Sequence, residues 1–179
     1  MSGQDFSLLP FPSVSRRPDF EIKGNIKKTS NTLSISYTLP GPHEGLIIPA
    51  LSEVPARKNA LWEETCFEFF LRQKHSEQYW EFNLSPAGHW NVYRFRAYRQ
   101  GMQEEPAFTS LPLSVRKHSA ALQLALEVNL DKIVPADGTI KVAISAVIKS
   151  TDRETTYWAL VHPGQRADFH LEESFTVEL

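Results

Sequence analysis

The chain has 179 residues, of which 41% are hydrophobic and 22% charged, a composition typical of one folded domain. A formal charge of -2 leaves no excess of Lys and Arg for a phosphate backbone, so we expect no nucleic-acid partner, and the scattered basic residues predict no membrane anchor. The single cysteine, Cys66, excludes an intramolecular disulfide and a multi-thiolate metal site. Together with the lack of a secretory leader pattern, it favours a cytoplasmic location.

The first 19 residues are rich in Ser and Pro and follow neither the helical nor the strand period. We interpret residues 1–19 as an N-terminal arm or an irregular first strand, and residues 20–179 as a single domain. Period-two alternation starts at Phe20 and Ile22 and returns over residues 33–39, with turn-type residues at Gly24-Asn25. Residues 40–60 are then a long loop that either caps an edge of the fold or carries function.

Three segments in the middle of the chain give the clearest strand signal. Residues 65–71, 79–85 and 91–98 each alternate an apolar face with a face that includes carboxylate, amide or guanidinium groups. Short turn-like stretches separate them. The pattern predicts a three-stranded antiparallel meander.

Further alternating runs follow at residues 122–130, 140–148, 157–160 and 175–179. Residues 126–134 also permit a helix, but the period-two pattern fits them better. Eight or nine short strands with no helix of useful length predict an all-β protein, an antiparallel β-sandwich with a jelly-roll-like arrangement.

A tryptophan precedes the first strand of the meander, and a carboxylate follows within that strand. Trp62 at a strand end can stack on a sugar ring, while Glu68 can accept hydrogen bonds from vicinal hydroxyls. The alternative is that Trp62 closes the end of the core and Glu68 faces solvent.

The next strand places Glu81 and Asn83 on one face, so pairing with the Glu68 strand would bring the three polar groups together. Buried carboxylates require a ligand, a cation such as a structural calcium ion, or arginine partners, for which Arg94, Arg96 and Arg99 are candidates. Glycoside hydrolysis by these carboxylates is not expected, because nothing in the sequence marks one of them for a raised pKa.

No nucleophile or phosphate-binding motif is present, and the histidines form no H-E-x-x-H pair. Asp168, His170 and Glu172 would lie on one face of an extended segment, which indicates either a metal or ligand contact or an ordinary surface histidine.

Several motifs together resemble the bacterial DOMON-like family, which is similar to the type 9 carbohydrate-binding modules. The likeness spans about Phe20 to Leu179 and rests on these stretches: Leu61-Trp62 with Thr65-Cys66-Phe67-Glu68, Tyr79-Trp80-Glu81-Phe82-Asn83-Leu84-Ser85-Pro86 with Trp90 and Tyr93, Phe95-Arg96-Ala97-Tyr98-Arg99, Tyr157-Trp158-Ala159-Leu160, His162-Pro163 and Ala167-Asp168-Phe169-His170.

The resemblance implies a β-sandwich that binds a sugar or haem on one sheet. For a sugar, Trp62 and Glu68 look like a clamp residue and its carboxylate, with Trp158 or Trp90 as the second clamp. For haem, it implies Met102 as one axial ligand, with His89, His162 or His170 opposite.

We therefore expect a non-catalytic module that binds a saccharide or a related small polar ligand. Its predicted ligand-binding residues are Trp62, Glu68, Glu81, Asn83, Arg94, Trp158 and His170. The alternatives are a haem-binding domain and an interaction domain without a small ligand. The sequence leaves the oligomeric state open.

Overall fold

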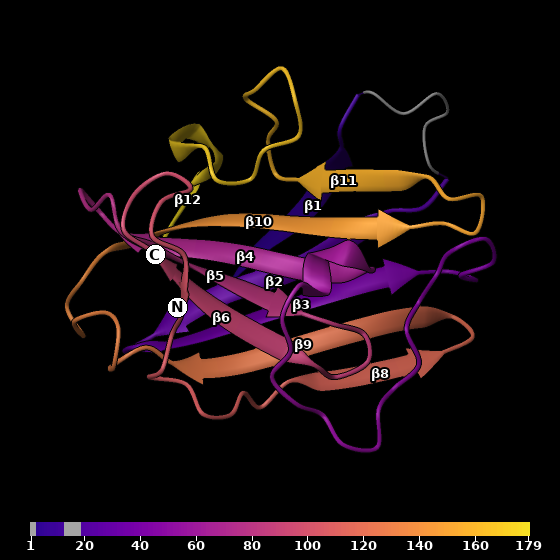
Figure 1. The fold of residues 1–179 in the computed structure, drawn as a ribbon, viewed down its shortest axis with the longest axis horizontal. Helices are drawn as coiled ribbons and strands as arrows, with labels where there is room; N and C mark the ends of the chain where they lie inside the picture. Colours follow the sequence, from indigo (N-terminus) through magenta and orange to yellow (C-terminus); the bar gives the residue numbers. More distant parts are fainter. Residues whose placement is uncertain (1–2, 13–18) are drawn as a thin grey trace.

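Antiparallel strands are the main regular structure of the computed structural model, which describes residues 3–12 and 19–179 (Figure 1). They form one curled sheet that folds over on itself as a β-sandwich. One half, the first sheet, consists in spatial order of β1 (Gln4–Pro10), β2 (Ile22–Thr29), β3 (Thr32–Pro40), β9 (Ala121–Asn129) and β8 (Ser114–His118). The other half, the second sheet, consists of β7 (Gln103–Glu104), β6 (Trp90–Phe95), β5 (Tyr79–Leu84), β4 (Cys66–Gln73), β10 (Ile140–Lys149) and β11 (Thr155–Ala159), with β12 (Val177–Glu178) beside β10.

Strand β1 joins the two sheets. Its residues from Gln4 to Leu8 pair with β2, and Leu9 and Pro10 pair with β11. The prediction of a separate arm over residues 1–19 is therefore wrong for residues 4–10, and its alternative of a first strand is correct there. The rest of the predicted arm at residues 1–2 and 13–18 lies outside the described residues.

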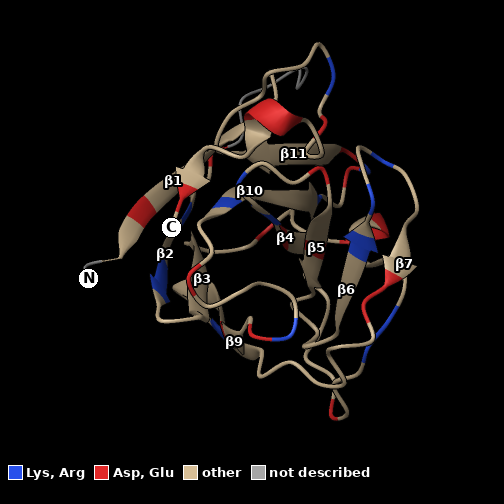
Figure 2. Ribbon diagram, turned by 90° about the vertical axis from the view of Figure 1, so that its left-hand side faces the viewer, with Lys and Arg blue, Asp and Glu red and all other residues tan. Residues whose placement is uncertain are grey.

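The core side chains come from strands of both sheets, and Figure 2 shows the ribbon turned by 90° from the view of Figure 1. In β9, from Leu122 on, buried residues alternate with exposed ones, so that Leu122, Leu124 and Leu126 face inward. The second sheet contributes Phe69 and Phe82, whose rings stack with centroids 4.4 Å apart. Burial of one face of each strand is the main stabilisation expected for such a sandwich.

Gly24 and Asn25 were predicted as a turn but lie inside β2. Phe6 of β1 is the cross-strand partner of Gly24, and a Cβ at Gly24 would meet the Phe6 ring at 2.3 Å. The glycine is needed because an aromatic ring and a neighbouring backbone occupy the space of its side chain. The glycine at position 24 is therefore explained by the close approach of the Phe6 ring, and not by a turn.

The loop over residues 41–60 packs on the sandwich. Leu46 and Ile48 contact the main core, and the Arg57 guanidinium lies 4.7 Å from the centre of the Trp90 ring. The loop therefore covers part of the core, in agreement with the capping alternative.

The predicted meander is confirmed, because β4, β5 and β6 are consecutive antiparallel neighbours. Residues 121–129 form a strand and not a helix. Two strands were not predicted: β7 is only two residues long, and β8 is largely exposed and carries charged residues at the sheet edge.

Lys and Arg are interspersed with Asp and Glu around the ribbon (Figure 2). No helix among the described residues has the length and apolar character needed to cross a membrane.

Candidate ligand-binding site

The outer face of the second sheet is covered. Every residue of β5, and every residue of β4 up to Leu71, is buried, although only one face of each strand meets the main core. Two segments cover the other face: the short 3-10 turn η1 (Leu61–Glu63), and residues 161–176, which we call the cover segment. A second apolar cluster forms beneath them, made of Phe70, Tyr79, Tyr93, Phe95, Ala143 and Phe175, with Trp62 and Phe169 packed against it.

Ion pairs and hydrogen bonds tether the cover segment to the sheet. Asp168 forms an ion pair with Arg99 at 2.9 Å and accepts a hydrogen bond from the Tyr98 hydroxyl at 2.6 Å. Glu172, in the 3-10 turn η2 (Glu172–Ser174), pairs with Arg72 of β4 at 2.5 Å. The cover segment is thus held over the sheet by side chains at two points.

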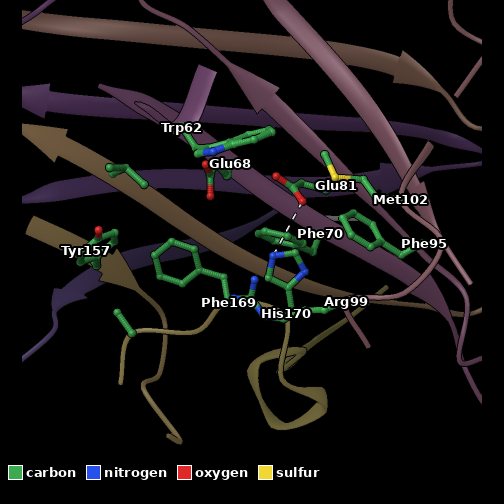
Figure 3. A pocket seen from close by; sticks show the side chains of 12 residues that line it. Trp62, Glu68, Phe70, Glu81, Phe95, Arg99, Met102, Tyr157, Phe169 and His170 are labelled. Atoms are coloured by element: carbon green, nitrogen blue, oxygen red, sulfur yellow. Dashed lines mark ion pairs between the residues drawn. The ribbon is translucent and has the colours of Figure 1, made fainter. Parts of the chain in front are cut away.

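A pocket of about 390 Å³ remains between Trp62 and the cover segment. Its apolar wall includes Trp62, Phe70, Phe95, Met102, Tyr157 and Phe169. Its polar lining consists of Glu68, Glu81, Arg99 and His170, and Figure 3 shows the Glu81 carboxyl and the His170 ring turned toward each other. The predicted polar face of the sheet is therefore neither open to solvent nor completely filled.

Strand register brings three predicted residues together. Glu68 of β4 lies opposite Asn83 of β5, and Glu81 lies one step along the same face, opposite Phe70. The Asn83 amide donates to Oε1 of Glu81 at 2.9 Å, and the Ser145 hydroxyl donates to Oε2 of Glu68 at 3.4 Å. The prediction that Glu68, Glu81 and Asn83 lie close together on one face of the sheet is therefore confirmed.

Burial is the main cause of the raised pKa values of Glu68 and Glu81. It raises the pKa of Glu81 to about 7, against opposing contributions from the Asn83 hydrogen bond and from Arg99. Burial, together with the nearby Glu81, raises the pKa of Glu68 well above its usual range. Nothing in the sequence marked either glutamate for a raised pKa, yet both pKa values are raised in the structure, because both side chains are buried.

His170 faces the carboxyl pair from the cover segment. Its Nδ1 lies 2.7 Å from the Tyr79 hydroxyl, and its Nε2 lies 3.9 Å from Oε2 of Glu81. Burial, assisted by Arg99, lowers the pKa of His170 to about 4, so the ring is neutral near pH 7. The Tyr79 hydroxyl already accepts the backbone N–H of Arg99 at 3.1 Å, so we assign its proton to Nδ1 and the imidazole proton to Nε2, which faces Glu81.

Three predicted ligand-binding residues do not reach the pocket. Asn83 is fully buried and contacts Glu81, but it does not line the cavity. Arg94 pairs across the strands with Trp80, so its side chain is on the opposite face from Glu81, where it donates to Gln103 at 3.2 Å. Trp158 is only 2% exposed and lies in the main core, where its indole N–H donates to Thr156. The other suggested clamp residue, Trp90, is also buried in the main core.

Several lining residues were not predicted as ligand contacts. Arg99 was considered only as a possible partner of the carboxylates, whereas it pairs with Asp168 beside the pocket. Phe95, Tyr157 and Phe169 reach the pocket from three separate segments. Their only sequence signal is that they are aromatic, which also fits a core position.

The suggested metal site at Asp168, His170 and Glu172 does not form. Asp168 is engaged by Arg99, Glu172 by Arg72, and His170 by Tyr79. Across residues 3–12 and 19–179, no three His, Cys, Asp or Glu side chains are grouped so as to hold a metal ion, the suggested structural calcium included.

Burial raises the pKa of the Cys66 thiol, as expected for a small buried hydrophobe.

The residues also fit haem poorly. Met102 and His170, two of the suggested axial ligands, do line the same pocket. However, Nε2 of His170 faces the Glu81 carboxyl, and Met102 is 44% exposed. An iron atom at Nε2 would have to displace a buried carboxyl group, so the donor set suits a polar organic ligand better.

No protein-family model matches the chain, and no curated protein matches its sequence. Among solved structures, a Bacteroides uniformis protein described provisionally as carbohydrate-binding is similar, with a TM-score of 0.67 and 14% identity over 94% of this chain and 83% of that one. A family 9 carbohydrate-binding module from Caldicellulosiruptor kristjanssonii in complex with cellotriose is also similar, with a TM-score of 0.51 and 9% identity over 84% of this chain and 70% of that one. At these identities the likeness concerns the fold, and the fold is a β-sandwich of the kind found in carbohydrate-binding modules.

Proposed function

We propose that the chain is a non-catalytic module that binds a saccharide in the pocket between Trp62 and the cover segment. The observation that carries the proposal is a pair of buried carboxyl groups, Glu68 and Glu81, lining a cavity bordered by an indole. Aromatic faces stack on the C–H face of a sugar ring, and carboxyl groups bind its hydroxyls.

We assign a role to each residue from its position in or beside the pocket. Trp62 is only partly buried and makes an edge contact with Tyr93 at 5.6 Å, so one side of the indole is available for a ring. Glu68, Glu81 and the Nε2–H of His170 would bind hydroxyls, with Asn83 orienting Glu81. The similar structure with cellotriose supports the ligand class by analogy only.

Calorimetric titration with a panel of monosaccharides and short oligosaccharides, glucose and cellotriose included, tests the proposal. Trp62→Ala should weaken binding about tenfold or more, since a lost stacking contact costs on the order of 1.4 kcal/mol or more. The matched control is Glu63→Ala, an exposed neighbour in the same 3-10 turn, which should bind as the native protein does.

The panel has two informative negative results. Absence of binding to every sugar, combined with a large loss of stability in Trp62→Ala, would show that Trp62 only closes the core. Release of reducing sugar from the oligosaccharides would contradict the non-catalytic assignment.

A further inference from the structure

Two carboxyl groups that line the pocket have no cationic partner in the part of the chain that the structure describes. Glu68 and Glu81 are 3% and 5% exposed, and neither forms an ion pair with a Lys or Arg among the described residues. The nearby guanidinium groups of Arg99 and Arg72 already pair with Asp168 and Glu172. An unpaired buried carboxylate is costly, so burial favours the protonated form of both groups, and a positive charge supplied by a ligand would stabilise the ionised form.

One carboxyl oxygen is available for that charge. Oε1 of Glu81 accepts from Asn83, whereas Oε2 has no hydrogen-bond donor within the described part of the chain. Its contact with Nε2 of His170, at 3.9 Å, is too long for a hydrogen bond. The carboxyl lines the cavity and is seen there beside Phe95 and Met102 (Figure 3).

The surrounding side chains suit an organic cation. Trp62, Phe70 and Phe95 contribute aromatic surfaces to the same cavity. An ammonium group near such faces gains a cation–π attraction in addition to its hydrogen bonds with carboxylates. A bare metal ion would instead need several converging oxygen or nitrogen ligands, and the described residues offer no such group.

We propose that the saccharide bound here is an amino sugar, whose ammonium group donates to Oε2 of Glu81 and lies close to Glu68. This inference rests on the proposed function, since it identifies the class of saccharide. Asn83 holds the carboxyl through its hydrogen bond to Oε1, and His170 borders the place where the ammonium group binds.

Binding should release protons. The titratable and charged groups around Glu81 are Cys66, Glu68, Tyr79, Tyr93, Arg99 and His170. Burial holds the pKa of Glu81 at about 7. An arriving ammonium group stabilises the carboxylate, so the proton on Glu81 passes to the buffer while the ligand keeps its own charge. A neutral sugar brings no charge and should release none.

Glucose, glucosamine and N-acetylglucosamine are the probes, because they share one ring and differ in charge. They are titrated calorimetrically just below the pKa of about 7 of Glu81, in two buffers of different ionisation enthalpy. Glucosamine should bind about tenfold or more tightly than the two neutral sugars, and only glucosamine should release a proton, up to about one per ligand. Glu81→Gln should remove both the preference and the release.

The matched control is Glu64→Gln, which makes the same change at an exposed residue outside the pocket lining and should preserve both effects. If Glu81→Gln does not fold, the comparison of the three sugars on the native protein still decides the inference, and Glu68→Gln is the second variant. Equal binding of glucose and glucosamine overturns the amino-sugar inference and leaves the proposed function intact. Failure of all three sugars, and of the wider panel, overturns the proposed function itself.

Discussion

The buried carboxyl of Glu81 holds a proton more tightly in the folded chain than in the unfolded chain. Burial is the main cause, and it raises the pKa from 4.5 to about 7. Between these two values the folded state binds more protons than the unfolded state, so this group stabilises the fold below about pH 4.5, and that contribution is lost as the pH rises through 7. His170 acts oppositely, since its lowered pKa makes the fold less stable as the pH falls from 6.5 toward 4.

Glu81→Gln should remove the loss of stability that Glu81 causes as the pH rises from 4.5 to about 7. The pKa shift of Glu81 corresponds to about 3 kcal/mol at most. As the pH rises from 4.5 to above 7, the free energy of unfolding of the variant should therefore increase by on the order of 1 to 3 kcal/mol relative to that of the native protein. Urea denaturation below pH 4.5 and above pH 7 measures this difference. Glu64→Gln, at an exposed position, is the control, and an unchanged pH slope in Glu81→Gln would contradict the assignment.

Individual residues were predicted with uneven success. Trp62, Glu68, Glu81, Asn83 and His170 come together around one site, because strand alternation and pairing fix the positions of the three β-strand residues. Arg94 was misplaced, since an arginine at a core-facing position near a sheet edge has the same sequence signature as one that faces a ligand. Alternation identifies the face of a strand, but it does not distinguish two tryptophans such as Trp62 and Trp158.

At the scale of elements, the cover segment decides whether the polar face of the sheet is a pocket. Its residues 161–176 include the short η2 turn but no strand, and they are held by Asp168 and Glu172. Such an irregular segment, fixed mainly by side chains, should open more easily than the strands beneath it.

Asp168→Asn should loosen the cover segment. The change removes the ion pair with Arg99 and weakens the hydrogen bond from Tyr98. Because the Arg99 side chain is 51% exposed, we expect a loss of global stability of only about 1 kcal/mol. Hydrogen exchange measured by mass spectrometry should show faster exchange over residues 161–176.

Glu173→Gln is the matched control, since Glu173 is exposed in the same segment. It should leave the exchange pattern unchanged. Equal protection of residues 161–176 in Asp168→Asn and the native protein would mean that the Glu172–Arg72 ion pair and the apolar contacts of Phe169 and Phe175 hold the cover segment without Asp168.

At the scale of the whole molecule, the two sheets enclose one main hydrophobic core. Trp158 packs there against Phe20, with ring centroids 4.8 Å apart, and is almost fully buried. Its neighbour Tyr157 points to the other face of β11 and is 38% exposed. Adjacent aromatic residues of one strand therefore have different roles.

Trp158→Ala should lower the free energy of unfolding by about 3 to 5 kcal/mol, because it leaves a large cavity in the core. Tyr157→Ala should lower it by no more than about 1 to 2 kcal/mol, since that side chain is partly solvated. Guanidinium denaturation of both variants measures the difference. A loss under about 1 kcal/mol in Trp158→Ala would restore this residue as a candidate for the site.

The sequence by itself determined the fold class, the central meander and the shared face of Glu68, Glu81 and Asn83, because these follow from a local period of two and from the pairing of consecutive strands. Only the tertiary structure decided that this face is covered, that His170 and Arg99 meet it, and that its carboxyl groups have raised pKa values. These properties depend on contacts between β4 or β5 and a segment some 90 residues away, as in the Tyr79–His170 pair. Desolvation arises from the sum of such contacts, and no local pattern in the chain encodes it.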